Sequence, residues 1–178
     1  MSAPKIFLAL KNKEYHIKVK GRANFECCPS LRTIVGNFET SSIISVTIDL
    51  SECSGMDSCF MGILGMIAVK ARQHGFVVNI LNAGENNKKL LNGLGLQKLF
   101  TYIEKKEDEA EEKQWVEKTR GADRLETAHT VLDAHKTLME LDEDNVKRFK
   151  NVVEFVKKDI ENEEKKQSDS PSTEQKTN

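Results

Sequence analysis

The stretch Val46–Gly75 constrains the fold most, because it changes from strand periodicity to helix periodicity within a few residues. At its start, Val46, Ile48 and Leu50 alternate with polar residues, which is typical of a strand covered mainly on one face. Gly75 ends the helix that follows. The apolar residues of that helix fall on one stripe: Phe60, Ile63, Leu64, Ile67, Ala68 and Ala71. The chain is therefore predicted to contain a buried strand that leads directly into a buried helix.

Asp57 stands at the joint between this strand and this helix. Its carboxylate is placed to accept hydrogen bonds from the free amides of the first helical turn. Ser58 is then the first helical residue, and its hydroxyl lies beside the positive end of the helix dipole. We single out Ser58 as the candidate functional group. The alternative is an ordinary serine in the first turn of a helix.

The segments around this unit continue the alternation of strands and helices. Such an alternation predicts an α/β fold with a mixed sheet, mostly parallel but with an antiparallel N-terminal edge, packed with helices. The antiparallel edge is a hairpin that turns at Asn12-Lys13. The expected elements are hairpin strands at 5–10 and 15–20, a helix from Pro29 to about 39–42, a buried strand at 76–81 and a short helix at 85–92.

The rest of the chain predicts a helical extension outside the sheet domain, which we place at residues 1–103. Residues 104–122 are nearly all charged and indicate a linker or a solvated helix. Two apolar stripes at helix spacing predict a helical hairpin over 123–160, with Asp142 placed to cap its second helix. Residues 161–178 are too polar to bury a core, so we expect a disordered polar tail there.

Charge and hydropathy argue against membrane and nucleic-acid functions. No stretch is long and apolar enough to span a bilayer, and the N-terminus lacks the pattern of a signal peptide. We therefore expect a cytoplasmic protein without a membrane span. Residues 1–103 carry 12 Lys and Arg against 7 Asp and Glu, and this excess is too modest to indicate a nucleic-acid partner.

The cysteines and histidines do not indicate an enzyme or a metal protein. Cys27, Cys28, Cys53 and Cys59 lack the spacing of a metal knuckle, so we interpret them as buried free thiols and expect no metal or cofactor. No His or second Cys is placed by sequence to form a nucleophilic pair with Cys59. His135, on a stripe of the extension, is interpreted as a boundary residue rather than a ligand.

Two separated motifs resemble the STAS domain of bacterial anti-sigma factor antagonists. The sequence DLS at 49–51 and DS at 57–58, with Gly62, are similar to the family pattern D-L-S followed after a few residues by D-S-S-G-L-G. Downstream, GLGLQKLF at 93–100 is similar to the family's G-L-x-x-L-F ending. The resemblance covers about 5–103 and leaves the C-terminal helices unexplained.

This resemblance implies a phosphorylation switch. In such antagonists the serine after the aspartate is phosphorylated by the anti-sigma factor, an ATP-dependent serine kinase, and a serine phosphatase restores the hydroxyl. The unmodified antagonist binds the kinase and frees the sigma factor. The resemblance makes Ser58 the phosphorylation site and assigns the partner-binding surface to Asp57, Cys59, Met61 and Gly62, with Asn24 where many members carry an aspartate.

One departure from the family pattern and two other functions stay open at this stage. Phe60 replaces a glycine of the pattern, so it either enlarges the surface beside Ser58 or turns into the core. The chain could instead be a STAS scaffold or regulatory subunit that never cycles through phosphate. It could also be an interaction protein whose C-terminal helices mediate homo-oligomerisation.

Overall fold

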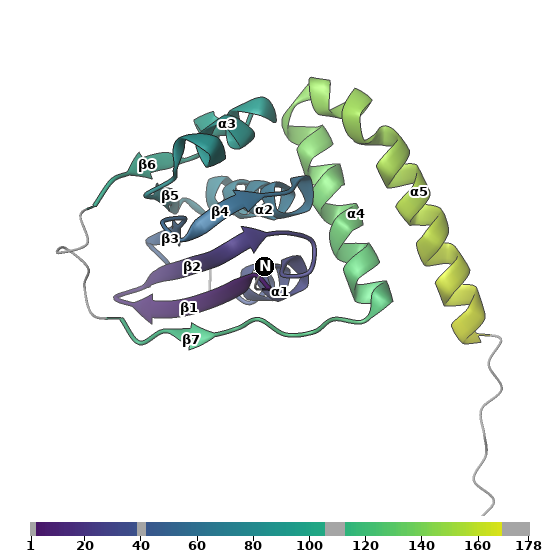
Figure 1. Ribbon diagram of the computed structural model, residues 1–178, viewed down its shortest axis with the longest axis horizontal. Helices are drawn as coiled ribbons and strands as arrows, with labels where there is room; N and C mark the ends of the chain where they lie inside the picture. Colours follow the sequence, from purple (N-terminus) through teal and green to yellow (C-terminus); the bar gives the residue numbers. More distant parts are fainter. Residues whose placement is uncertain (1–2, 39–41, 106–112, 169–178) are drawn as a thin grey trace, which may run out of the picture.

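The computed structural model of the chain describes residues 3–38, 42–105 and 113–168 (Figure 1). Its strands are β1 (Lys5–Lys11), β2 (Glu14–Ala23), β3 (Ser45–Asp49), β4 (Cys53–Met56), β5 (Val77–Leu81), β6 (Thr101–Ile103) and β7 (Val116–Glu117). Its helices are α1 (Cys28–Gly36), α2 (Ser58–His74), α3 (Glu85–Gly93), the 3-10 turn η1 (Gln97–Leu99), α4 (Arg124–Leu141) and α5 (Glu143–Ser168).

The strands form one mixed sheet in the order β6-β5-β3-β2-β1-β7, and β4 pairs with β2 beside this path. β1 and β2 are antiparallel, and their turn places Asn12 and Lys13 at φ 52° and 66°, as a two-residue hairpin turn requires. The pairs β2–β3, β3–β5 and β5–β6 are parallel. The predicted α/β fold with an antiparallel N-terminal edge is confirmed. β7 adds one more antiparallel strand outside β1.

Several element boundaries differ from the sequence prediction. β4 and β6 were not predicted, because strands of three or four residues are too short to show a period. β4 also pairs with β2 across a shift of register next to Gly21. α1 ends at Gly36, before the predicted end at 39–42, of which residues 39–41 lie outside the described residues.

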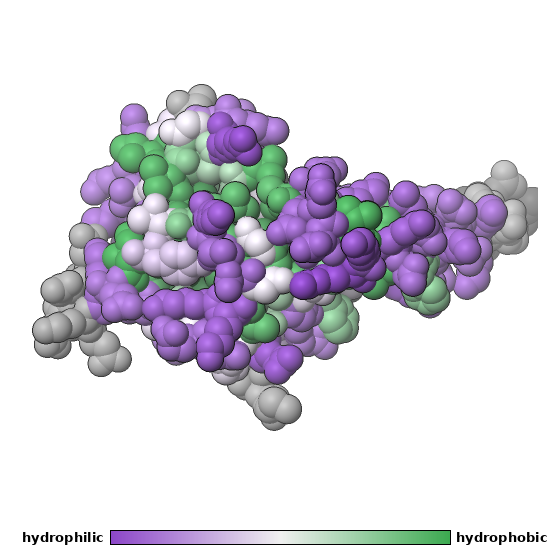
Figure 2. Space-filling view, turned by 90° about the horizontal axis from the view of Figure 1, so that it is seen from above, coloured by the Kyte–Doolittle hydropathy of each residue, from purple (hydrophilic) through white to green (hydrophobic). Residues whose placement is uncertain are grey.

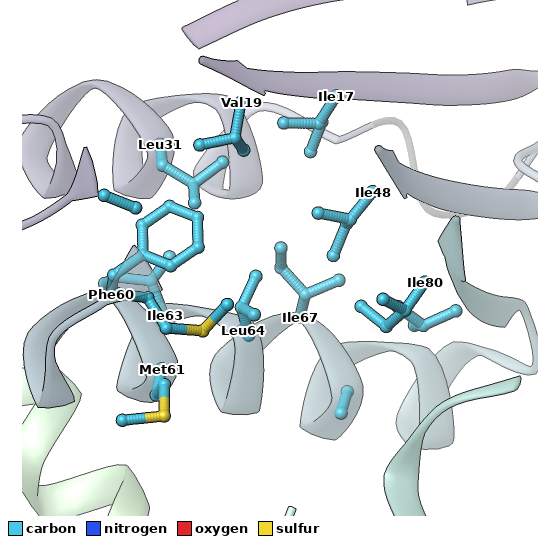
Figure 3. Close-up of a cluster of buried hydrophobic side chains, with 14 of the residues drawn as sticks. Ile17, Val19, Leu31, Ile48, Phe60, Met61, Ile63, Leu64, Ile67 and Ile80 are labelled. Atoms are coloured by element: carbon cyan, nitrogen blue, oxygen red, sulfur yellow. The ribbon is translucent and has the colours of Figure 1, made fainter. Parts of the chain in front are cut away.

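The main core lies between the sheet and α2, with α1 beside it (Figure 3). Phe60 is 0% exposed and points toward the side chains of the sheet and of α1, so it belongs to the interior and does not enlarge the surface beside Ser58. Met61 points to the opposite side of α2. One side of α2 therefore builds the core, and the other is left for a second layer.

The described part of the predicted linker, 104–122, is extended rather than helical. Lys118 N donates to Ile6 O at 2.8 Å, and Ile6 N donates to Thr119 Oγ1 at 2.7 Å. Arg120 N then donates to Ser30 Oγ at 3.0 Å. The alternative of a solvated helix thus fails for 113–122, which form a strap along β1 and α1.

The predicted helical hairpin is present as α4 and α5, and it lies beside the domain with α4 on the inside (Figure 1). Asp142 Oδ1 accepts from Asp144 N at 2.9 Å, as expected of the cap. α5 continues to Ser168, so the helix is longer than predicted and the region 161–168 is not a disordered tail. Glu163 explains part of this, since it pairs with Arg124 and Lys166 at 3.4 Å and 3.0 Å. The rest of the predicted tail, 169–178, lies outside the described residues.

None of the helices in the described residues combines the length and the apolar character needed to cross a membrane. Seen from above, the hairpin projects from the domain and its side chains on this face are mostly hydrophilic, whereas hydrophobic side chains also show over the middle of the domain (Figure 2).

Candidate switch site at the start of helix α2

Asp57 fixes the start of α2 with two hydrogen bonds. Its Oδ1 accepts from Phe60 N at 2.8 Å, so the predicted N-cap is confirmed. Its Oδ2 accepts from Phe25 N at 2.9 Å, in the loop between β2 and α1. Asp57 N in turn donates to Ala23 O at 3.0 Å. One carboxylate thus caps the helix and holds the neighbouring loop against it.

This loop brings Asn24 to the same edge of the domain as Asp57. Asn24 is half-buried, and its Oδ1 accepts from Glu26 N at 3.1 Å, which shapes the turn before α1. Phe25 beside it is 48% exposed. The structure therefore places Asn24 in the loop that Asp57 holds against the start of α2. A role of Asn24 in partner contact stays a prediction.

Ser58 is half-buried, and its hydroxyl has a partner that the sequence analysis did not foresee. Ser58 Oγ lies 3.0 Å from His135 Nε2, contributed by α4. His135 Nδ1 lies 2.8 Å from Val131 O, a carbonyl that can only accept, so in the neutral ring Nδ1 donates. Nε2 then accepts, and Ser58 donates its hydroxyl proton to it.

His135 is 5% exposed and packs edge-on against Phe149 of α5, with ring centroids 4.9 Å apart. The sequence placed it correctly on an apolar stripe of the first C-terminal helix. Its interpretation as a boundary residue is wrong, because it is buried and hydrogen-bonded. Its contact joins residues 77 positions apart, and no local pattern encodes such a contact.

The other predicted partner-binding residues are buried as well. Met61 is 5% exposed, on the side of α2 away from the core. A Cβ atom on Gly62 would overlap the carbonyl oxygen of Ala134 and lie 2.7 Å from the Ala134 Cβ. The backbone of α4 therefore packs directly against this glycine. Cys59 is buried toward α1, next to Cys28. Asp57 and Asn24 therefore remain the more accessible of the predicted group.

All four cysteines are free and buried. Hydrogen bonds to Cys27 and Cys59, together with burial, raise the pKa of Cys28 far above its usual range, so this thiol keeps its proton. Burial also raises the pKa of Cys53. The thiols fill space in the interior, as the sequence analysis predicted. Within 3–38, 42–105 and 113–168, no three His, Cys, Asp or Glu residues gather in a way that could hold a metal ion.

Comparisons with known proteins agree with the topology. The family model described as "STAS domain" matches residues 10–110, which leaves the α4–α5 hairpin outside the match. The solved structure of the anti-sigma factor antagonist SpoIIAA in its unphosphorylated form is 14% identical, with a TM-score of 0.50, and the alignment covers 59% of this chain and 92% of that one.

A second structure gives the same result. The Bacillus cell fate determinant SpoIIAA in its phosphorylated form is 15% identical, with a TM-score of 0.50, and covers 58% of this chain and 94% of its own. At such identities the likeness shows a common fold. A search of curated proteins found no match.

Proposed function

Because the chain belongs to the STAS domain family, we propose that it is an anti-sigma factor antagonist that works by partner switching in the cytoplasm. In this proposal an anti-sigma factor with serine kinase activity binds the chain while Ser58 carries a free hydroxyl. The kinase transfers the γ-phosphoryl group of ATP to Ser58 Oγ, with loss of the hydroxyl proton and release of ADP. The complex then separates, and a serine phosphatase hydrolyses the phosphate to restore the hydroxyl.

The observation that carries the proposal is the place of Ser58, directly after the capping Asp57 and inside the segment that matches the family. A phosphoryl group there adds about −1.5 to −2 charges at neutral pH. The helix dipole favours an anion at this end by about 0.3–1 kcal/mol, so the domain tolerates the modification. A protein surface packed against a bare hydroxyl does not, since it would have to desolvate or repel the added charge.

The modification state of Ser58 tests the proposal. We expect phosphopeptide mapping of the chain, recovered from its own cells, to locate a phosphate on Ser58. Ser58→Ala should abolish the signal, whereas Ser54→Ala, at an exposed serine of β4, should leave it unchanged. Absence of phosphate from Ser58 in every growth condition tested, or its presence only on another residue, would contradict the proposal.

A second candidate function is a STAS scaffold that assembles through its C-terminal helices. It is favoured by exposed apolar side chains of α5, where Val146 and Val152 are partly exposed and Phe155 is 72% exposed. In that case the mass of the chain in solution should exceed that of a monomer, and Phe155→Glu should return it to the monomer value. A wild-type monomer at high concentration would exclude this candidate.

A further inference from the structure

The face of α2 that lies beneath α4 is the partner surface of the proposed function. Ser58, Met61, Gly62 and Gly65 are spaced i, i+3, i+4 and i+7, so they share one side of the helix. α4 packs on this side, with Ala134 0% exposed at its contact with Gly62. The chain's own helix therefore occupies the place that an external partner would need.

The hairpin has an apolar cluster of its own, and α5 also contacts the domain, where Asn145 Nδ2 donates to Leu94 O at 3.1 Å and Phe149 packs against the main core. α4 uses one face for the domain core, through Val131, Ala134, Leu138 and Leu141. It uses another face for a small apolar cluster with α5, formed by Leu125, Ala128, Leu132, Met139, Val153, Val156 and Ile160. Because this second cluster contains no residue of the sheet domain, α4 and α5 can leave α2 together without losing it.

The contact between α4 and the domain is partly polar and is not continuous. Arg32 of α1 pairs with Asp133 of α4, and Ser58 bonds to His135. Farther along, a groove between α1, α2 and α4 is lined by Met66, Lys70 and Thr137 among others. Water can replace the polar bonds when the helices separate, and the groove leaves part of α2 uncovered already.

A phosphate on Ser58 does not fit under α4. The hydroxyl oxygen lies 3.0 Å from His135 Nε2, a single hydrogen-bond length, and the imidazole is buried. A phosphate cannot lie along this bond unless the helices move apart or the half-buried Ser58 side chain turns away from His135 and gives up the bond. The same packing shields the hydroxyl of Ser58 from a kinase while α4 is in place.

We propose that α4 is an internal competitor for the partner surface on α2. This inference rests on the proposed function and adds a closed state to it: the partner binds by displacing the α4–α5 hairpin, and phosphate on Ser58 prevents both the partner and α4 from docking. The geometry also states the kind of partner that fits. Such a partner presents an amphipathic helix with a small residue opposite Gly62, in the position that Ala134 occupies in the closed state.

Hydrogen–deuterium exchange of the full-length chain tests the closed state without any partner. Ala134→Glu places a carboxylate in the α2–α4 contact and changes no residue of the sheet domain, whereas Lys136→Glu places the same side chain on the exposed side of α4. Ser58→Glu approximates the phosphate, and Ser58→Ala removes only the hydroxyl. We expect exchange across α4 to rise more than tenfold in Ala134→Glu and Ser58→Glu, and less than threefold in the two controls, with β3 and β5 unchanged.

Two results would overturn the inference. One is an α4 that stays as protected in Ser58→Glu as in the wild type. The other is loss of protection in β3 and β5 together with α4, which would make the hairpin an integral part of the domain fold. Either result stands whether or not Ser58 is ever modified.

Phosphate occupancy in cells then separates this inference from the proposed function. If both hold, Ala134→Glu should carry more phosphate on Ser58 than the wild type, and Lys136→Glu should carry the same amount. If no form carries phosphate, the proposed function fails and the exchange data still decide the closed state. If Ser58 is phosphorylated equally in all forms, the shielding by α4 fails and the proposed function stands.

Discussion

Replacement of Phe60 by alanine is expected to lower the free energy of unfolding by about 3–5 kcal/mol. The side chain is 0% exposed and lies between α2, α1 and the sheet, so its removal leaves a cavity that the surrounding β-strands cannot close (Figure 3). Chemical denaturation followed by circular dichroism measures the loss. Because the cavity lies directly behind the first turn of α2, the variant should also make this turn, and Ser58 within it, less rigidly held.

Phe155→Ala is the matched control for this prediction. It removes the same ring from α5, where the side chain is 72% exposed, so stability should change by no more than about 0.5 kcal/mol. Similar losses in the two variants would mean that Phe60 does not support the core in the way described.

Gly62→Ala is expected to separate α4 from α2, although it adds only one carbon. The new Cβ would meet backbone atoms of Ala134, which cannot rotate away. The gain in helix propensity of α2 is the same whether α4 is docked or not, so it does not offset the packing cost in the docked state. A packing cost of about 1–3 kcal/mol should therefore raise exchange of the α4 amides about 5- to 150-fold.

Two other glycines provide controls for this steric argument. A Cβ on Gly65 would lie 2.8 Å from Leu141 Cδ1, the end of a flexible side chain, so Gly65→Ala should cost less. A Cβ on Gly36, at the end of α1, would meet nothing within 4 Å among the described residues beyond its own helix, and Gly36→Ala should leave α4 unaffected. If Gly62→Ala behaved like Gly36→Ala, the close approach of the two helices would be refuted.

The sheet domain was largely readable from local patterns. Alternation at Val46, Ile48 and Leu50, the helix stripe after Asp57 and the turn at Asn12-Lys13 each depend on residues a few positions apart. Local periodicity reports which face of an element is buried, and that is enough to assign the succession of strands and helices along the chain and the α/β class.

The layer above α2 was not readable in the same way. The sequence showed that the C-terminal helices carry apolar stripes, but a stripe does not state what it packs against. The bond between Ser58 and His135 and the contact between Gly62 and Ala134 depend on the docking of one helix on another. The accessibility of the candidate site is therefore a tertiary property, and the structure changes the expected open surface into a covered one.

The strap that precedes α4 affects how tightly an external protein must bind to α2. Residues 116–120 are hydrogen-bonded to β1 and α1. When the hairpin dissociates from α2, it therefore stays connected to the domain by a linker of only a few residues. A linker this short gives α4 an effective concentration at α2 in the roughly millimolar range. The helix of an external partner must bind α2 strongly enough to compete with α4 at this effective concentration. Proteins that bind α2 only weakly therefore do not displace the hairpin.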